Sequence, residues 1–172
     1  MWGRESAAAR LEGTADARAT LGELNRRSFT RAFGVPHDAA TDAELLDAIV
    51  YNVFPNFAPW GGFAPNIVYR WRPLGRSVEA CIMEVMLLKR HPVDLPRPRG
   101  APVHWLRDDE PWSSAKELPI LGPVIDQDMQ NMPHVQEGLR ASATQLVQLG
   151  NYQEARIRHF HQTLERYLAD GG

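Results

Sequence analysis

Cysteine is almost absent from this sequence: Cys81 is the only one among 172 residues. A lone cysteine excludes a disulfide within the chain, and it excludes an iron–sulfur cluster held only by cysteines of this chain. Few cysteines are typical of proteins from a reducing compartment, so we expect a cytoplasmic location. Because Cys81 lies in the apolar run 81–88, we expect its side chain to be buried as a small hydrophobic group and not to act as a nucleophile.

The chain also lacks a strong charge of either sign and a long apolar run. Its formal net charge is −2, which argues against a general binder of nucleic acid or of acidic membranes. The most apolar stretch, 81–88, is interrupted by Glu84 and falls far short of the ~20 residues that cross a membrane. The first residues lack the apolar core of an export signal. The 44% of hydrophobic residues suffice for the core of one domain, or of the larger part of one.

The first third of the chain reads as helical. Residues 5–33 are rich in good helix formers with apolar residues at helical spacing, and Gly34 is a plausible end of that helix. Thr41 is followed three residues later by Glu44, which is the pattern of a capping box. We therefore expect a second, short helix over residues 42–48.

The middle of the chain reads as an antiparallel meander of three strands. Residues 49–54, 66–72 and 78–89 are rich in β-branched and aromatic residues, and residues 56–65 between the first two are a Gly- and Pro-rich loop. Residues 90–119 are irregular and rich in proline. The basic and acidic residues of this segment favour a solvated surface loop over a docking site. A loop this long is uncommon in a compact domain, so a cover over a subunit interface or a pocket stays an alternative.

The last part of the chain returns to helix. From Asp126 onward the pattern is helical, with a break or kink expected at 131–133 because proline removes a backbone hydrogen bond. We expect this segment to end at Gly150. Asn151 is then the expected N-cap of a last helix over residues 152–168.

Two carboxylates, Asp126 and Asp128, stand at the expected start of the helical segment. Carboxylates at a helix start usually cap it, since their oxygens accept hydrogen bonds from the free backbone N–H groups. A carboxylate at this position can also be a metal ligand, although this is the less common case. The residues by themselves leave both readings open.

Histidines offer a weaker metal signal. His159 and His161 are two positions apart, and on a helix such residues point about 200° away from each other, so we expect them not to chelate one ion. His134 lies six residues after Asp128 and is either a partner of a metal ligand or a surface histidine, the second being favoured.

Three segments together resemble a known family. Residues 51–56 (Tyr-Asn-Val-Phe-Pro-Asn), 126–139 (from Asp-Gln-Asp to Gln-Glu-Gly-Leu) and 151–161 (Asn-Tyr-Gln-Glu to His-Phe-His) are similar to motifs of the catalytic, or alpha, subunit of Rieske-type aromatic-ring-hydroxylating oxygenases. They occur in the family's order and at about its spacing. The resemblance covers roughly residues 45–170 and places the chain in the C-terminal portion of the family's catalytic domain.

The resemblance implies a fold. The family's catalytic domain is α+β with a helix-grip architecture of the Bet v1/START-like kind, in which an antiparallel sheet packs on a long C-terminal helix. We expect that fold to be incomplete in this chain. Residues 1–48 would form the N-terminal helical segment of the catalytic domain, and residues 49–172 its C-terminal part.

The resemblance also implies a mononuclear Fe(II) held by two histidines and one carboxylate, with electrons delivered from NAD(P)H through a reductase, a ferredoxin and a Rieske 2Fe-2S cluster. Asp128 best matches the family's carboxylate ligand; Asp126 is the alternative and would otherwise be the helix cap. No two histidines here have the spacing of the family's pair, and the cluster ligands are missing. We therefore expect a truncated reading frame, a separated piece or an expressed fragment, inactive alone.

By the same resemblance, the substrate is aromatic or similarly apolar and is oxidised with O2. Candidate pocket residues are Phe54, Asn56, Tyr69 and Met83. The family assembles as homotrimers or as α3β3 oligomers, and no nucleic-acid or membrane partner is expected. The alternatives are a non-catalytic helix-grip module that binds a hydrophobic ligand, or an inactive fragment.

Overall fold

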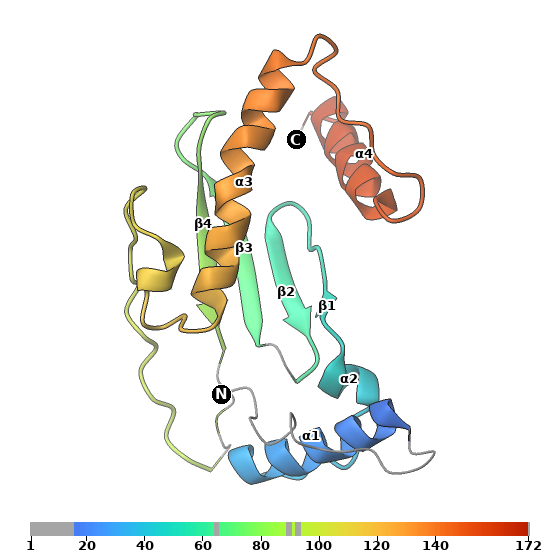
Figure 1. The fold of residues 1–172 in the computed structure, drawn as a ribbon, viewed down its shortest axis with the longest axis vertical. Helices are drawn as coiled ribbons and strands as arrows, with labels where there is room; N and C mark the ends of the chain where they lie inside the picture. The colour runs from blue at the N-terminus through green and yellow to red at the C-terminus, as the bar shows by residue number, and fades with distance from the viewer. Residues whose placement is uncertain (1–15, 64–65, 89–90, 92–93, 172) are drawn as a thin grey trace. The chain divides into compact units, whose positions relative to one another are not determined.

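A computed structural model gives the structure of the chain for the residues 16–63, 66–88, 91 and 94–171. These residues belong to two compact units, Met1–Arg97 and Pro98–Gly172, each of which is described by itself. The first unit carries a four-stranded antiparallel sheet with two helices, and the second is helical (Figure 1). The α+β class predicted from the sequence is therefore confirmed. In the described part of the chain, every helix is too short or too polar to cross a membrane.

The first helix, α1, spans Ala17–Phe33. It begins after Asp16, whose carboxylate accepts a hydrogen bond from a backbone N–H of the first turn at 2.8 Å. It ends at Gly34, whose φ of 70° is a left-handed conformation that glycine adopts without steric cost. The predicted helix 5–33 is confirmed over the described residues, and the predicted part before Asp16 lies outside them.

The second helix, α2, spans Asp42–Leu46. The N–H of Glu44 donates to the hydroxyl of Thr41 at 3.3 Å, and the N–H of Thr41 donates to the carboxylate of Glu44 at 2.8 Å. This reciprocal pair is the capping box predicted from the sequence. The helix ends before the predicted limit of 42–48, because the backbone of Asp47 is already extended.

Polar and apolar contacts hold α1 and α2 together. Arg26 of α1 forms an ion pair with Asp42 and donates to the carbonyl of Ala40 at 3.0 Å. Leu45 is 2% exposed and anchors α2 in the core. His37, which is 4% exposed, is buried among three aromatic rings at centroid distances of 6.0, 6.0 and 5.0 Å: Phe29, Phe33 and Phe63.

The sheet is an antiparallel meander of four strands in the order β1-β2-β3-β4 (Figure 1). The antiparallel pairing of strands that follow one another in sequence is the arrangement predicted above. The strands are β1 (Ile49–Val50), β2 (Phe57–Gly61), β3 (Ile67–Pro73) and β4 (Cys81–Leu87).

Three strand predictions need correction. The predicted strand 49–54 is only two residues long, and much of the predicted loop 56–65 is in fact the strand β2. Pro59 made this segment resemble a loop, since proline cannot donate to a sheet. Its carbonyl nevertheless accepts a hydrogen bond from the N–H of Tyr51 at 3.0 Å, which requires no donor from proline. The predicted strand 78–89 begins three residues later than expected.

The predicted burial of Cys81 is wrong. Cys81 is exposed, because it opens β4 and pairs with Pro73 at the very end of the β3–β4 ladder. An apolar sequence context predicts burial only where neighbouring strands continue on both sides of a residue, and here the ladder stops.

The second unit consists of an irregular segment followed by helices. The irregular segment contains one short 3-10 helix, η2, at Trp112–Ser114. The long helix α3 spans Leu121–Ala141, and α4 spans Ala155–Ala169, close to the predicted helix 152–168 (Figure 1). The solvated character predicted for the irregular segment agrees with the exposure of most of its described residues.

Helix α3 differs from the prediction at its start and in its middle. It begins at Leu121, five residues before Asp126, because Pro123 lies in the first turn, where a missing N–H costs nothing. Of the break or kink predicted at 131–133, the break does not occur, because α3 continues through Pro133. Proline removes one backbone hydrogen bond of the helix, and the hydrogen bonds before and after it keep the helix continuous.

The connection between α3 and α4 also differs from the prediction. Helix α3 ends at Ala141 and not at Gly150. The residue preceding α4 is Glu154 and not Asn151, and its side chain does not cap that helix. Arg158 instead donates to the carbonyls of Gly150 and Asn151, so that a side chain of the helix itself fixes the loop before it.

Candidate functional site

Two backbone N–H groups hold the carboxylate of Asp126. The N–H of Trp112 donates to Oδ1 at 2.6 Å, and the N–H of Ser113 donates to Oδ2 at 3.0 Å. Hydrogen bonds to its carboxylate lower the pKa of Asp126. The side chain of Ser113 has the largest effect, and the backbone N–H groups of Ser113 and Trp112 add to it. The prediction that Asp126 caps its own helix is wrong, because α3 starts five residues earlier. Asp126 instead satisfies the first N–H groups of η2.

A close backbone approach accompanies this contact. A Cβ atom at Gly122, in the first turn of α3, would lie 2.7 Å from the carbonyl oxygen of Trp112 and 2.8 Å from the Cα of Ser113. Glycine is therefore required for η2 to lie against α3. The apolar side chains of Ala115, Leu118 and Ile125 are buried in the same unit, at 4, 7 and 3% exposure. We call the two Asp126 hydrogen bonds together with this approach the Asp126–η2 contact.

Asp128 has different surroundings. Its side chain is exposed, and among the residues that the structure describes it takes part in no hydrogen bond or ion pair. Two positions along an α-helix correspond to a rotation of about 200°. Asp128 therefore points away from the side of α3 on which Asp126 binds η2. Of the two acids singled out by the sequence, only Asp128 keeps both carboxylate oxygens available for a ligand.

Two candidate pocket residues lie on one face of the sheet. Tyr69 of β3 pairs with Val85, and Trp71 pairs with Met83 of β4, so Tyr69 and Met83 occupy the same face. The ring centroid of Tyr69 lies 5.8 Å from that of Trp71 and 6.3 Å from that of Trp60. The structure thus brings Tyr69 and Met83 together on an aromatic surface of the first unit.

The other two candidate pocket residues lie in the turn before β2. Phe54 is half-buried there. The side-chain amide of Asn56 donates to the carbonyl of Trp71 at 2.7 Å, and the N–H of Trp71 donates back to the carbonyl of Asn56 at 3.0 Å. The side-chain amide of Asn56 is therefore hydrogen-bonded to β3 and connects the turn to this strand.

Sequence reasoning missed the residues that hold Asp126. Trp112 and Ser113 act through their backbone N–H groups, which every residue other than proline has, and they lie fourteen and thirteen positions before Asp126. No residue type or spacing marks such a contact. Gly122 was the one available signal, since glycine inside a helix often has a packing reason.

The described histidines form no common centre. His104 Nδ1 lies 2.8 Å from the carboxylate of Glu117, and this contact lowers the pKa of Glu117. His134 lies 3.7 Å from the carboxylate of Glu137, and both side chains are 75% exposed, which fits the favoured reading as a surface histidine.

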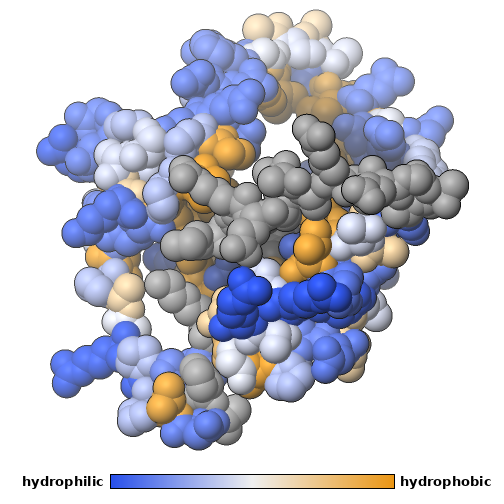
Figure 2. Space-filling view, turned by 60° about the horizontal axis from the view of Figure 1, so that its bottom comes forward, coloured by the Kyte–Doolittle hydropathy of each residue, from blue (hydrophilic) through white to orange (hydrophobic). Residues whose placement is uncertain are grey.

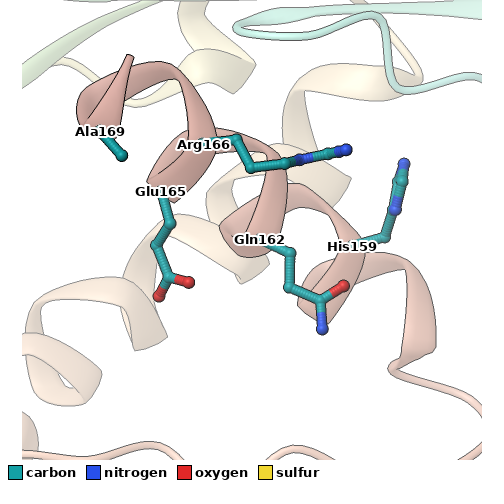
Figure 3. A pocket seen from close by; sticks show the side chains of 5 residues that line it. All are labelled: His159, Gln162, Glu165, Arg166 and Ala169. Atoms are coloured by element: carbon teal, nitrogen blue, oxygen red, sulfur yellow. The ribbon is translucent and has the colours of Figure 1, made fainter. Parts of the chain in front are cut away.

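A depression in the surface follows one face of α4 (Figure 3). All the side chains that line it come from this single helix, and the sequence singled out only one of them, His159, which was not expected to chelate a metal with His161. It contains no close acid–base pair among the contacts of the described residues. We assign it no catalytic role. Its lining residues are His159, Gln162, Glu165, Arg166 and Ala169.

A complete metal centre is not present in the described part of the chain, where no three His, Cys, Asp or Glu side chains lie together so that they could hold a metal ion. Asp128 offers one carboxylate. An iron held by two histidines and one carboxylate needs two further donors. The described residues therefore fit the carboxylate part of such a site and do not fit the site as a whole.

A comparison with protein families identifies the family of the chain. The family model of the ring-hydroxylating alpha subunit (catalytic domain) matches residues 4–170. The chain belongs to this family. The match confirms the resemblance seen in the three sequence segments, and it extends that resemblance over the N-terminal helices. No curated protein matches the chain, and no solved structure matches it. The family is one of oxidoreductases whose intact members contain a non-haem iron and a Rieske cluster.

Proposed function

We propose that this chain is the C-terminal part of the catalytic domain of a Rieske-type oxygenase alpha subunit. The intact subunit would hydroxylate an aromatic or similar apolar substrate with O2 and with electrons from NAD(P)H. The observation that carries the proposal is the family match over residues 4–170. Asp128, an exposed carboxylate without a partner in the described residues, best matches the family's iron ligand in the sequence motif, and this supports the proposal.

Asp128 is the residue to which we assign the carboxylate ligand. Asp126 is the weaker candidate, because both of its oxygens already accept backbone hydrogen bonds. Asp128 would hold Fe(II) together with two histidines. Among the described residues, no such pair lies together with Asp128 as a group of three ligands. When bound, such an iron supplies the activation of O2 beside the substrate. Because the described residues do not complete the site, we derive no reaction step through it.

The sheet would supply the wall of the substrate pocket. Tyr69 and Met83 lie on one face beside Trp60 and Trp71, and this apolar, aromatic surface suits a flat hydrophobic substrate. Phe54 and Asn56 would form the edge of the pocket. We propose the helix-grip arrangement of the family for the sheet and the C-terminal helices, and a ferredoxin and reductase as electron-transfer partners.

The coding DNA on the 5′ side of the Met1 codon tests this function. The proposal predicts a sequence there for a Cys-x-His…Cys-x-x-His cluster motif and for an Asp-x-x-His-x-x-x-x-His pair, in the same reading frame or in an adjacent one. A neighbouring sequence without either motif would contradict an oxygenase, and would favour a non-catalytic module that binds a hydrophobic ligand.

The iron content of the isolated 172-residue chain is a second test. We expect close to none after purification in the presence of Fe(II), because one carboxylate cannot hold Fe(II) tightly. One iron per chain would show that this chain contains a complete site, and would overturn the assignment of missing ligands.

A further inference from the structure

We draw no further inference here: the strongest candidate, the aromatic face of the sheet on which Trp60, Tyr69 and Trp71 lie together, belongs to the substrate pocket already proposed, and nothing in the described part of the chain shows what covers it.

Discussion

Two acids that stand two positions apart in the sequence have different partners in the structure. Asp126 accepts hydrogen bonds from backbone N–H groups more than ten positions earlier, and Asp128 is exposed. The sequence identified both as candidates, from a family motif and from the chemistry of carboxylates. It could not predict the partners of Asp126, because the donors are backbone groups and carry no sequence signature. The structure was needed to show them.

The glycines of α3 give a matched pair of substitutions. Gly122→Ala should lower the free energy of unfolding by about 1–3 kcal/mol, since the added Cβ would lie 2.7 Å from the carbonyl oxygen of Trp112. Gly138→Ala has open space around its Cβ and should raise it by up to about 1 kcal/mol, because alanine is the better helix former. Urea denaturation followed by circular dichroism measures both. Equal effects of the two substitutions would show that η2 does not lie against Gly122.

Glu84 predicts a dependence of stability on pH. A hydrogen bond from Arg70, and a further one from Arg72 at 2.8 Å, lower the pKa of Glu84 from 4.5 to about 2. The folded chain keeps Glu84 ionised at pH values where the unfolded chain protonates it. This stabilisation is therefore present above about pH 4.5 and is lost as the pH falls toward 2.

Glu84→Gln should remove this contribution. We expect the variant to be less stable than the wild type by no more than about 1 kcal/mol at neutral pH, because the arginines are 45 and 40% exposed and water screens the pair. The difference should shrink as the pH falls from 4.5 to 2. Denaturation curves over this range measure it, with Asp108→Asn in the exposed loop as the control. A difference that stays constant with pH would refute the ion-pair assignment.

Among the elements, those with local signals were predictable. The capping box of α2 is encoded within four residues, Thr41 to Glu44, and it forms as predicted. The meander of the sheet follows from short connections between strand-like segments, and it also forms. Elements whose limits depend on proline were less predictable. Pro59 lies inside a strand, where its carbonyl accepts a hydrogen bond and no N–H is needed. Pro133 lies inside a helix, which continues although one backbone hydrogen bond is lost.

The capping box gives the prediction at the scale of an element. Thr41→Ala should lower the free energy of unfolding by about 1 kcal/mol, because the N–H of Glu44 loses its acceptor. Thr41→Ser keeps the hydroxyl and should cost only a few tenths of that. Thermal unfolding of both variants measures the difference. An equally large loss for serine would mean that the methyl group of Thr41, and not its hydroxyl, stabilises α2.

At the scale of the whole molecule, large apolar side chains lie exposed on the second unit. Met132 and Val135 of α3 are each 53% exposed, and Leu168 of α4 is 73% exposed. The face drawn in Figure 2 likewise shows hydrophobic residues among the hydrophilic ones. Apolar helix faces of this kind are the ones that pack against other elements in a layered domain.

The candidate site was predictable only in part at this scale. The family motif pointed to residues 126–139, and the family match covers these residues. The sequence also showed that a histidine pair with the family's spacing is missing, and the described residues contain no three ligands in one place. A site built from distant segments is visible to sequence reasoning only through its motifs, because tertiary contacts bring its parts together. Tyr69 and Met83 were candidate pocket residues from the sequence, and the strand register shows that they lie on a common face of the sheet.

The iron content of the longer subunit that we propose, carrying Asp128→Asn and measured by inductively coupled plasma mass spectrometry, tests the central claim most directly. The account predicts that the variant binds mononuclear iron about a hundredfold more weakly than the wild type, and that the visible absorbance of its Rieske cluster is unchanged. Wild-type mononuclear iron in Asp128→Asn would contradict the account.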